Sequence, residues 1–340
     1  MSAGSGSLPR YIGQRVLLVI PMILVLLTVV FLLLRVAPGD PVTAAVGGKL
    51  DPQAIALRRH QLGLDQPLYM QYLEYIKNVV TLNFGHTISD NRPVIDVIRD
   101  NGGATLTLTL GAFIFALLIG IPLGLIAGRM RDTVPDVAIR LFGVVTYAAP
   151  IFWTGLLLVI LVAPSGWPTY DIASPETKFL VHPITHILLL DCILQGNVPA
   201  TIDVLQHHLL PCLTLGLLLC GVFIRLVRVN LLQSLQGDYV EAARARGIPE
   251  KFVIRRHAFR NALVPVITVI GLQVALTMAG AVLTEKTFNW PGVGNQLVKY
   301  LDARDYNAVQ GLVTFFAIVV VIVSVLVDIV NAMIDPRVRY

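Results

Sequence analysis

Few residues of this 340-residue chain have the types and spacing that catalysis or metal binding requires. A phosphate-binding loop of the form GxxxxGK[ST] is approached once, but Thr43 stands where its first Gly is needed and no Ser or Thr follows the Lys. His182 and His186 have the spacing of a zinc-protease motif, but Pro183 replaces the required Glu and disfavours a helix. We therefore predict no catalytic residue and no metal site.

One polar segment, residues 237–247, has the pattern of a short helix with defined ends. Asp238 is suited to accept free backbone amides as N-cap, and Glu241 three residues later completes a capping box. Gly247 can end the helix in a left-handed conformation. Pro249 then favours the start of a second helix that runs toward Arg260.

The small residues Ala242 and Ala243 are expected on the surface of this helical knob. Small side chains let another protein approach closely, so the knob could enter a groove of a partner and transmit a rigid push. An ordinary basic loop explains the charges equally well. The residues alone leave both interpretations open.

Long apolar segments flank this loop and must position it. Hydrophobic residues make up 55% of the chain and charged residues 14%, with a mean hydropathy of +0.73, whereas about a quarter of the residues in a soluble domain are charged. Apolar runs of about 20 residues are long enough for helices that cross a bilayer. We predict an all-α integral membrane protein with a tail at 1–10, a membrane domain at 11–340, and six spans at about 12–34, 104–128, 137–163, 209–229, 262–283 and 309–334.

The distribution of Lys and Arg predicts the orientation of these spans. The side that carries both termini has 15 of the 26 basic residues in the shorter connections, and the other side has 11 in longer ones. Basic residues concentrate in short cytoplasmic loops. Both termini and the loop at 230–261 are therefore predicted to be cytoplasmic, and the segments 35–103 and 164–208 to be external. Basic residues placed between spans in this way do not indicate nucleic-acid binding.

The first external segment contains an amphipathic stretch with tyrosines at helical spacing, Tyr69, Tyr72 and Tyr75. A helix lying in the membrane interface is the favoured interpretation, and a docking surface for an external protein is the alternative. Asp328 is the one acid clearly inside a span, so a stand-alone secondary transporter, which would bury charges near the membrane centre, is a weaker hypothesis. The three cysteines show no CxxC spacing.

Several motifs resemble those of permease subunits of ATP-binding-cassette importers. Glu241, Ala242 and Ala243 followed by Gly247 resemble the EAA-x3-G signature of that family. The Leu-Val-Pro at 263–265 lies further along than in the general form and resembles the dipeptide, oligopeptide and nickel branch. Further matching segments are 37–41 (APGDP), 62–68 (LGLDQPL), 120–124 (GIPLG), 288–294 (FNWPGVG) and 335–340 (DPRVRY).

The resemblance implies the type I importer permease fold in a prokaryotic cell membrane. The chain would pair with a second permease, dock on two ATPases that bind ATP and Mg, and receive substrate from an external solute-binding protein. No cofactor is implied for this chain itself. Asp238, Glu241, Ala242, Ala243 and Gly247 would couple it to the ATPases. Short peptides are the favoured substrates, with nickel chelates, haem and oligosaccharides as alternatives.

Contacts with the binding protein and an outer gate are expected on the external side. The candidates are Tyr69, Tyr72, Tyr75, Trp290, Pro291 and Gly292.

Overall fold

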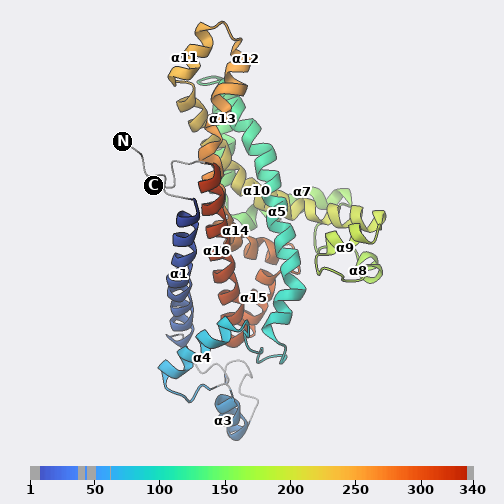
Figure 1. The fold of residues 1–340 in the computed structure, drawn as a ribbon. Helices are drawn as coiled ribbons and strands as arrows, with labels where there is room; N and C mark the ends of the chain where they lie inside the picture. The colour runs from blue at the N-terminus through green and yellow to red at the C-terminus, as the bar shows by residue number, and fades with distance from the viewer. Residues whose placement is uncertain (1–7, 37–42, 44–50, 62, 335–340) are drawn as a thin grey trace.

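The computed structural model describes residues 8–36, 43, 51–61 and 63–334. The regular secondary-structure elements of these residues are all helices. Figure 1 shows an elongated bundle of long helices. The long helices are α1 (Leu8–Val36), α5 (Val94–Arg129), α10 (Val198–Ser234), α14 (Val264–Thr287) and α16 (Tyr306–Ile334). The shorter ones are α3 (Pro52–Gln61), α4 (Leu68–Val80), α6 (Val134–Ala148), α7 (Ile151–Val162), α8 (Pro175–Leu180), α9 (Leu188–Leu194), α11 (Asp238–Ala245), α12 (Glu250–Phe252), α13 (Phe259–Ala262) and α15 (Val293–Asp302).

Helices α5 and α10 form the centre of the bundle because small residues let their backbones approach. Gly120, Gly124 and Gly128 recur every four residues along α5. A Cβ at these positions would lie 2.9 Å from Cβ of Phe223, 2.7 Å from Cβ of Val227 and 2.8 Å from Cδ2 of Leu231. This is the small-residue packing typical of helices in membranes. The pair α5 and α10 therefore provides a rigid axis along the molecule.

Among the described residues, four helices are long and apolar enough to cross a membrane, namely α1, α5, α10 and α16. They contain the first, second, fourth and sixth spans expected from the sequence, although α5 and α10 begin well before the expected boundaries. In the described part of the chain, a fifth candidate is a bent pair of helices. The structure thus confirms a helical protein with several membrane-spanning helices, and the number six stays a prediction.

The expected third span, 137–163, is wrong as a single straight helix. Helices α6 and α7 are long and apolar enough to cross a membrane only when they are taken together. The chain bends by 108° between them. The break is at Ala149, whose ψ of 133° is extended. A residue before proline is forced out of the helical region, and Pro150 follows here. Two helices therefore replace the expected one.

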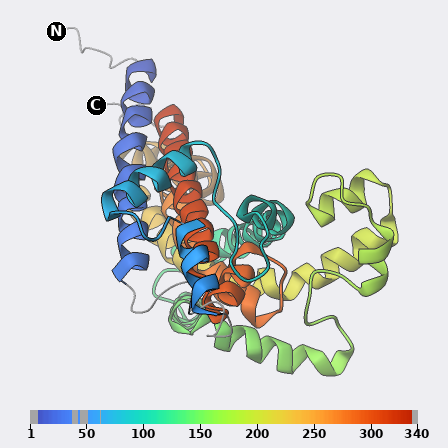
Figure 2. The same ribbon diagram turned by 90° about the horizontal axis from the view of Figure 1, so that it is seen from below.

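The bent pair creates an arm on one side of the bundle. Seen from below, α7, α8, α9 and the beginning of α10 stand to one side of α5, and α1, α4 and α16 stand to the other (Figure 2). The expected tail at 1–10 lies mostly outside the described residues, and α1 already begins at Leu8. The 37–41 and 335–340 motifs also lie outside them.

Candidate functional sites at the two ends of the molecule

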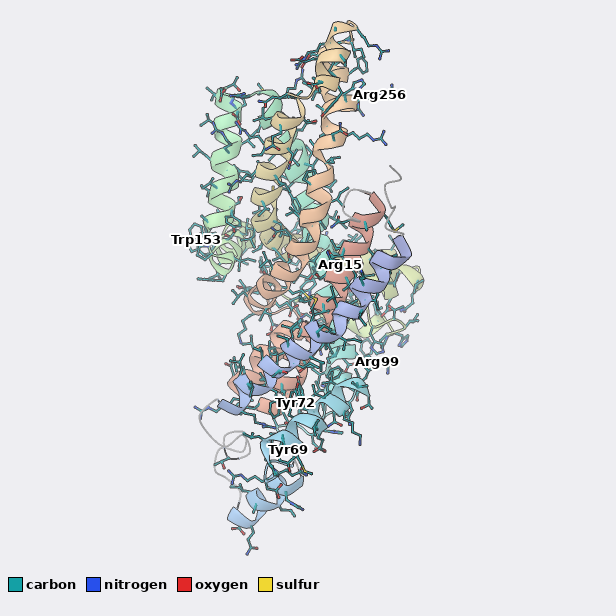
Figure 3. The ribbon with its side chains drawn as sticks, turned by 60° about the vertical axis from the view of Figure 1, so that its left-hand side comes forward. Arg15, Tyr69, Tyr72, Arg99, Trp153 and Arg256 are labelled. Atoms are coloured by element: carbon teal, nitrogen blue, oxygen red, sulfur yellow. The ribbon has the colours of Figure 1, made fainter. Side chains whose placement is uncertain are left out.

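Helices α11 and α12 form a projection at one end of the bundle, which we call the α11 knob (residues 237–252). Figure 3 places Arg256 beside it, far from Tyr69 and Tyr72 at the opposite end. The N-cap of α11 is Gly237, and no side chain caps its amides, so the expected capping box of Asp238 and Glu241 is wrong. Both acids instead lie in the first turn, where they favour the positive end of the helix dipole.

The C-terminal end of α11 is formed as the sequence predicted. Gly247 adopts a φ of +73°. Its amide donates to the carbonyl of Arg244 at 2.9 Å, and the amide of Ile248 donates to the carbonyl of Ala243 at 3.2 Å. This pair of bonds defines a Schellman motif, which requires a left-handed residue and so favours glycine. The turn between the two short helices is therefore fixed by the backbone.

The two sides of α11 face different environments. Val240 and Ala243 are buried against Leu231 of α10 and Val253 of the next helical segment. Ala243 is 4% exposed, so its expected place on the surface is wrong. Asp238, Glu241 and Ala242 are exposed. The knob thus presents a small polar face outward while its inner face is anchored on the long helices.

An ion pair spans the turn of the knob. Nε and Nη2 of Arg244 donate to the two carboxylate oxygens of Glu250, at 3.1 and 2.7 Å. The guanidinium lowers the pKa of Glu250, and the carboxylate raises the pKa of Arg244. Both groups are exposed, and exposed ion pairs contribute little to stability, so the turn depends mainly on its backbone bonds.

At the other end, the segment we call the Trp290 turn (residues 285–295) joins α14 to α15. Trp290 is completely buried. Its indole Nε1 donates to the carbonyl of Ala104 at 2.9 Å. Its ring packs edge to face on the imidazole of His208, with 4.5 Å between the ring centres. The expected gate residue Trp290 is thus a contact between α5, α10 and the turn within this chain. Its role as a gate stays a prediction.

A buried carboxylate that the sequence analysis did not single out organises this turn. Glu285 is fully buried and accepts bonds from Thr105 Oγ1 at 2.7 Å and from the amide of Asn295 at 2.8 Å. Thr105 Oγ1 also accepts from the amide of Val293 at 2.9 Å. A Cβ at Gly292 would lie 2.2 Å from Cδ of Glu285. Glycine is therefore required beside the carboxylate, and Glu285 fixes where α15 begins.

Two further buried acids hold connections in place and also escaped sequence reasoning. Asp136 binds Arg228 through two bonds of 2.7 and 2.8 Å and ties the beginning of α6 to α10. Asp305 accepts from the amides of Ile88 and Ser89 at 2.6 and 2.8 Å and so holds the loop that contains these residues against the beginning of α16. Their partners are 92 and more than 200 residues away, so no local pattern announces them.

The three candidate tyrosines of α4 do not share one environment. Tyr72 bonds to Thr28 of α1 at 2.7 Å, and Tyr75 bonds to Thr314 of α16 at 2.6 Å. Both rings also pack on Phe31. Tyr69 is 65% exposed and points away from the bundle (Figure 3). The expected helix is confirmed, Tyr69 is the most exposed of the three tyrosines, and its role in contacts with another protein stays a prediction.

Arg15 and Asp328 approach to 3.1 Å and join α1 to α16, which gives the one clearly intramembrane acid a structural contact. In the residues that the structure describes, no three His, Cys, Asp or Glu side chains gather as metal ligands. The cysteines there are unpaired and buried.

Comparison with known proteins assigns the chain to a family. Residues 120–340 match the family described as "Binding-protein-dependent transport system inner membrane component", and residues 8–109 match the N-terminal component of such systems. The chain belongs to this family. The permease is 38% identical to the di/tripeptide transport system permease protein DppB of Pseudomonas aeruginosa, over 97% of this chain and 98% of the relative.

Two other relatives cover the permease just as completely. It is 36% identical to the dipeptide transport system permease protein DppB of Escherichia coli K12, over 97% of this chain and 99% of the relative. It is also 36% identical to the glutathione transport system permease protein GsiC of Salmonella typhi, with the same coverage. The resemblance expected from the EAA-x3-G motif is thereby confirmed.

Proposed function

We propose that this permease forms one half of the translocation pathway of an ATP-binding-cassette importer for short peptides and couples that pathway to ATPases. The α11 knob carries the proposal. It exposes Glu241 and Ala242, ends in a fixed turn at Gly247, and packs through Val240 and Ala243 on the long helices. The full-length similarity to dipeptide permeases supports the substrate class.

The proposed complex contains this chain, a second permease, two ATPases and an external solute-binding protein. ATP and Mg are bound by the ATPases, so this chain needs no cofactor and is not itself an enzyme. The arm is the surface that we propose for contact with the second permease. Its helix α7 exposes large apolar side chains, among them Phe152, Trp153, Ile160 and Leu161. Lipid or a similar membrane helix would cover such a surface.

Mechanically, the knob converts movement of the ATPases into movement of the helices. Ser234 at the end of α10 donates to the carbonyl of Ala258 at 2.8 Å, so α10 and the segment leading into α14 are tied together where the knob joins them. A push on the exposed face of α11 therefore moves these helices together. Rigid elements with two arrangements are what alternating access requires.

The proposed orientation places both termini and the α11 knob in the cytoplasm and the Trp290 turn and α4 outside. The concentration of Lys and Arg in the shorter connections supports it. The proposal includes six spans, with α14 as one of them and the bent pair α6 and α7 as another. Trp290, Pro291 and Gly292 are proposed to move as a unit at the outer end of the pathway.

Two alternatives differ in substrate or energy source. In the first, the same machinery carries nickel chelates, haem or oligosaccharides; a relative from Salmonella choleraesuis is named a glutathione transport system permease protein. A stand-alone secondary transporter would move substrate without ATP. In the described part of the chain, its candidate charged group is Asp328, which pairs with Arg15.

The test is to purify the permease gently from its native membrane and identify the proteins that accompany it. The proposal predicts a second permease and ATPases, with ATP hydrolysis stimulated by a solute-binding protein loaded with a dipeptide. A chain recovered alone that transports dipeptides without ATP would establish the secondary transporter instead.

A further inference from the structure

Helices α1, α4 and α16 enclose a polar cavity at the end of the molecule opposite to the α11 knob. Its volume is about 270 Å³, and a water molecule occupies about 30 Å³, so it can hold a small polar group and some water. Its polar lining includes Arg35 of α1, Gln71, Glu74 and Asn78 of α4, and Asn307 and Gln310 of α16.

Arg35 brings a cation to this cavity. Its side chain is half-buried, with the guanidinium 5.3 Å from the ring centre of Phe31. Its Nε is buried and has no hydrogen-bond acceptor. In the described part of the chain, no carboxylate pairs with it. A buried donor without an acceptor is costly, and more so when it is charged, so the group calls for an anionic ligand.

Gln71 brings a buried acceptor without a donor to the same cavity. Its Nε2 donates to the carbonyl of Gln66 at 2.7 Å, which fixes the orientation of the amide. Its Oε1 is buried and receives no hydrogen bond. A ligand that satisfies both Arg35 and Gln71 must therefore carry an acceptor at one end and a donor at the other.

Glu74 shows that the donor end should be positively charged. Its carboxylate belongs to the same lining, and among the described residues it forms no ion pair with Arg35 or any other cation. A simple anion would be attracted by Arg35 and repelled by Glu74. A small zwitterion, with an anion toward Arg35 and an ammonium toward Glu74 and Gln71, suits both charges.

The position of the cavity favours the membrane as the source of this zwitterion. Arg35 ends the apolar stretch Ile12–Arg35 of α1, whose Leu32 and Leu33 are exposed. Helix α4 crosses the ends of α1 and α16 there and exposes Leu68 and Leu73 (Figure 1). A basic residue at the end of an apolar span and an amphipathic helix across it mark the level of the lipid headgroups.

From this geometry we infer that the cavity binds the headgroup of an aminophospholipid, with the phosphate at Arg35 and the ammonium at Gln71 and Glu74. Phosphatidylethanolamine has both charges and three N–H donors. Phosphatidylcholine has the charges but no N–H donor, and phosphatidylglycerol lacks the cation. The site thereby ties α1, α4 and α16 to one leaflet and selects among its lipids.

The test measures lipid binding to the purified complex that contains this permease, by native mass spectrometry with phosphatidylethanolamine, phosphatidylcholine or phosphatidylglycerol added. Wild type should retain phosphatidylethanolamine about tenfold more tightly than either other lipid, because two charge-assisted bonds depend on its headgroup. Arg35→Gln should weaken retention of all three lipids, and of phosphatidylethanolamine about tenfold, because each carries the phosphate that Arg35 binds. Glu74→Gln should make phosphatidylethanolamine and phosphatidylcholine equivalent.

Arg99→Gln and Glu176→Gln are the matched controls, because both residues are exposed and lie outside the cavity lining. They should leave the preference unchanged. Equal retention of the three lipids by wild type, or unchanged retention of phosphatidylethanolamine in Arg35→Gln, would overturn the inference. So would displacement of phosphatidylethanolamine by a free dipeptide with the same dependence on Arg35, which would make the cavity a solute site.

Discussion

The α11 knob and the Trp290 turn are both short connections at the ends of long helices, yet they are stabilised differently. The knob depends on neighbouring residues, since its turn is closed by backbone bonds between positions 243 and 248. The Trp290 turn depends on distant ones, since Glu285 and Trp290 bind Thr105 and Ala104 on α5. The knob exposes Glu241 and Ala242 of its motif, whereas the turn buries Trp290 and Gly292.

The difference indicates which part of each segment meets a partner. An exposed face on a locally determined scaffold can change its contacts without loss of the fold, as a transient docking surface must. A buried network spanning three helices cannot, so the Trp290 turn moves only together with the helices that hold it. Mutations should therefore separate the two regions, with stability lost at the turn and coupling lost at the knob.

Glu285→Leu should give the largest effect. It leaves the donors of Thr105 and Asn295 unpaired in a buried site and should lower the free energy of unfolding by about 3 kcal/mol. The matched change at the knob, Glu241→Leu, should leave stability nearly unaltered because Glu241 is exposed. Thermal unfolding of the detergent-purified complex measures both. Equal losses would remove the distinction between the two regions.

Glycine substitutions compare the regions more finely. In Gly292→Ala the added Cβ meets Glu285 at 2.2 Å, and such overpacking should destabilise the protein by about 2 kcal/mol. In Gly247→Ala the Cβ meets nothing within 4 Å, but the φ of +73° costs about 1 kcal/mol. Unfolding midpoints in denaturant should follow this order. A larger loss at Gly247 would show that the knob is not locally determined.

The coupling variants should reverse that order when transport is measured. Glu241→Lys and Gly247→Val are expected to reduce ATP-dependent peptide uptake about tenfold while the amount of permease in the membrane stays normal. Gly247→Asn is the control, since asparagine tolerates the left-handed conformation better than valine. Loss of the protein from the membrane in Glu241→Lys would instead make Glu241 a folding residue.

The smallest effect is expected for the ion pair across the knob. Because Arg244 lowers the pKa of Glu250 below 4.5, the pair stabilises the knob above that pH and is lost as the pH falls through the lowered value. Hydrogen exchange of the amides at 247–250 should therefore differ slightly between wild type and Arg244→Ala near neutral pH. The two proteins should become alike in acid, and a difference that grows there would contradict this account.

The features that the sequence predicted correctly are those determined by neighbours. The apolar runs at 12–34 and 309–334, the helical spacing of the α4 tyrosines and the turn at Gly247 all depend on residues within a few positions. The signature of α11 also led directly to the family. Local patterns with one dominant physical cause could therefore be interpreted from sequence alone.

The features that the sequence did not predict depend on the rest of the bundle. The capping box at Asp238 was a reasonable local expectation, but Gly237 takes the N-cap position. The 108° bend between α6 and α7 depends on how α7 packs, and Pro150 only permits it. Ala243 points inward because the following helices fold back over it. Glu285 lacked any signal, because its donors lie on α5 and beyond the turn.

The most direct test of the account is site-specific photo-crosslinking in native membranes. A photoreactive amino acid at the exposed position 242 should capture an ATPase subunit, and one at position 69, at the opposite end, should capture the solute-binding protein. An ATPase adduct at position 69, or none at position 242, would contradict the assignment of the α11 knob as the coupling element.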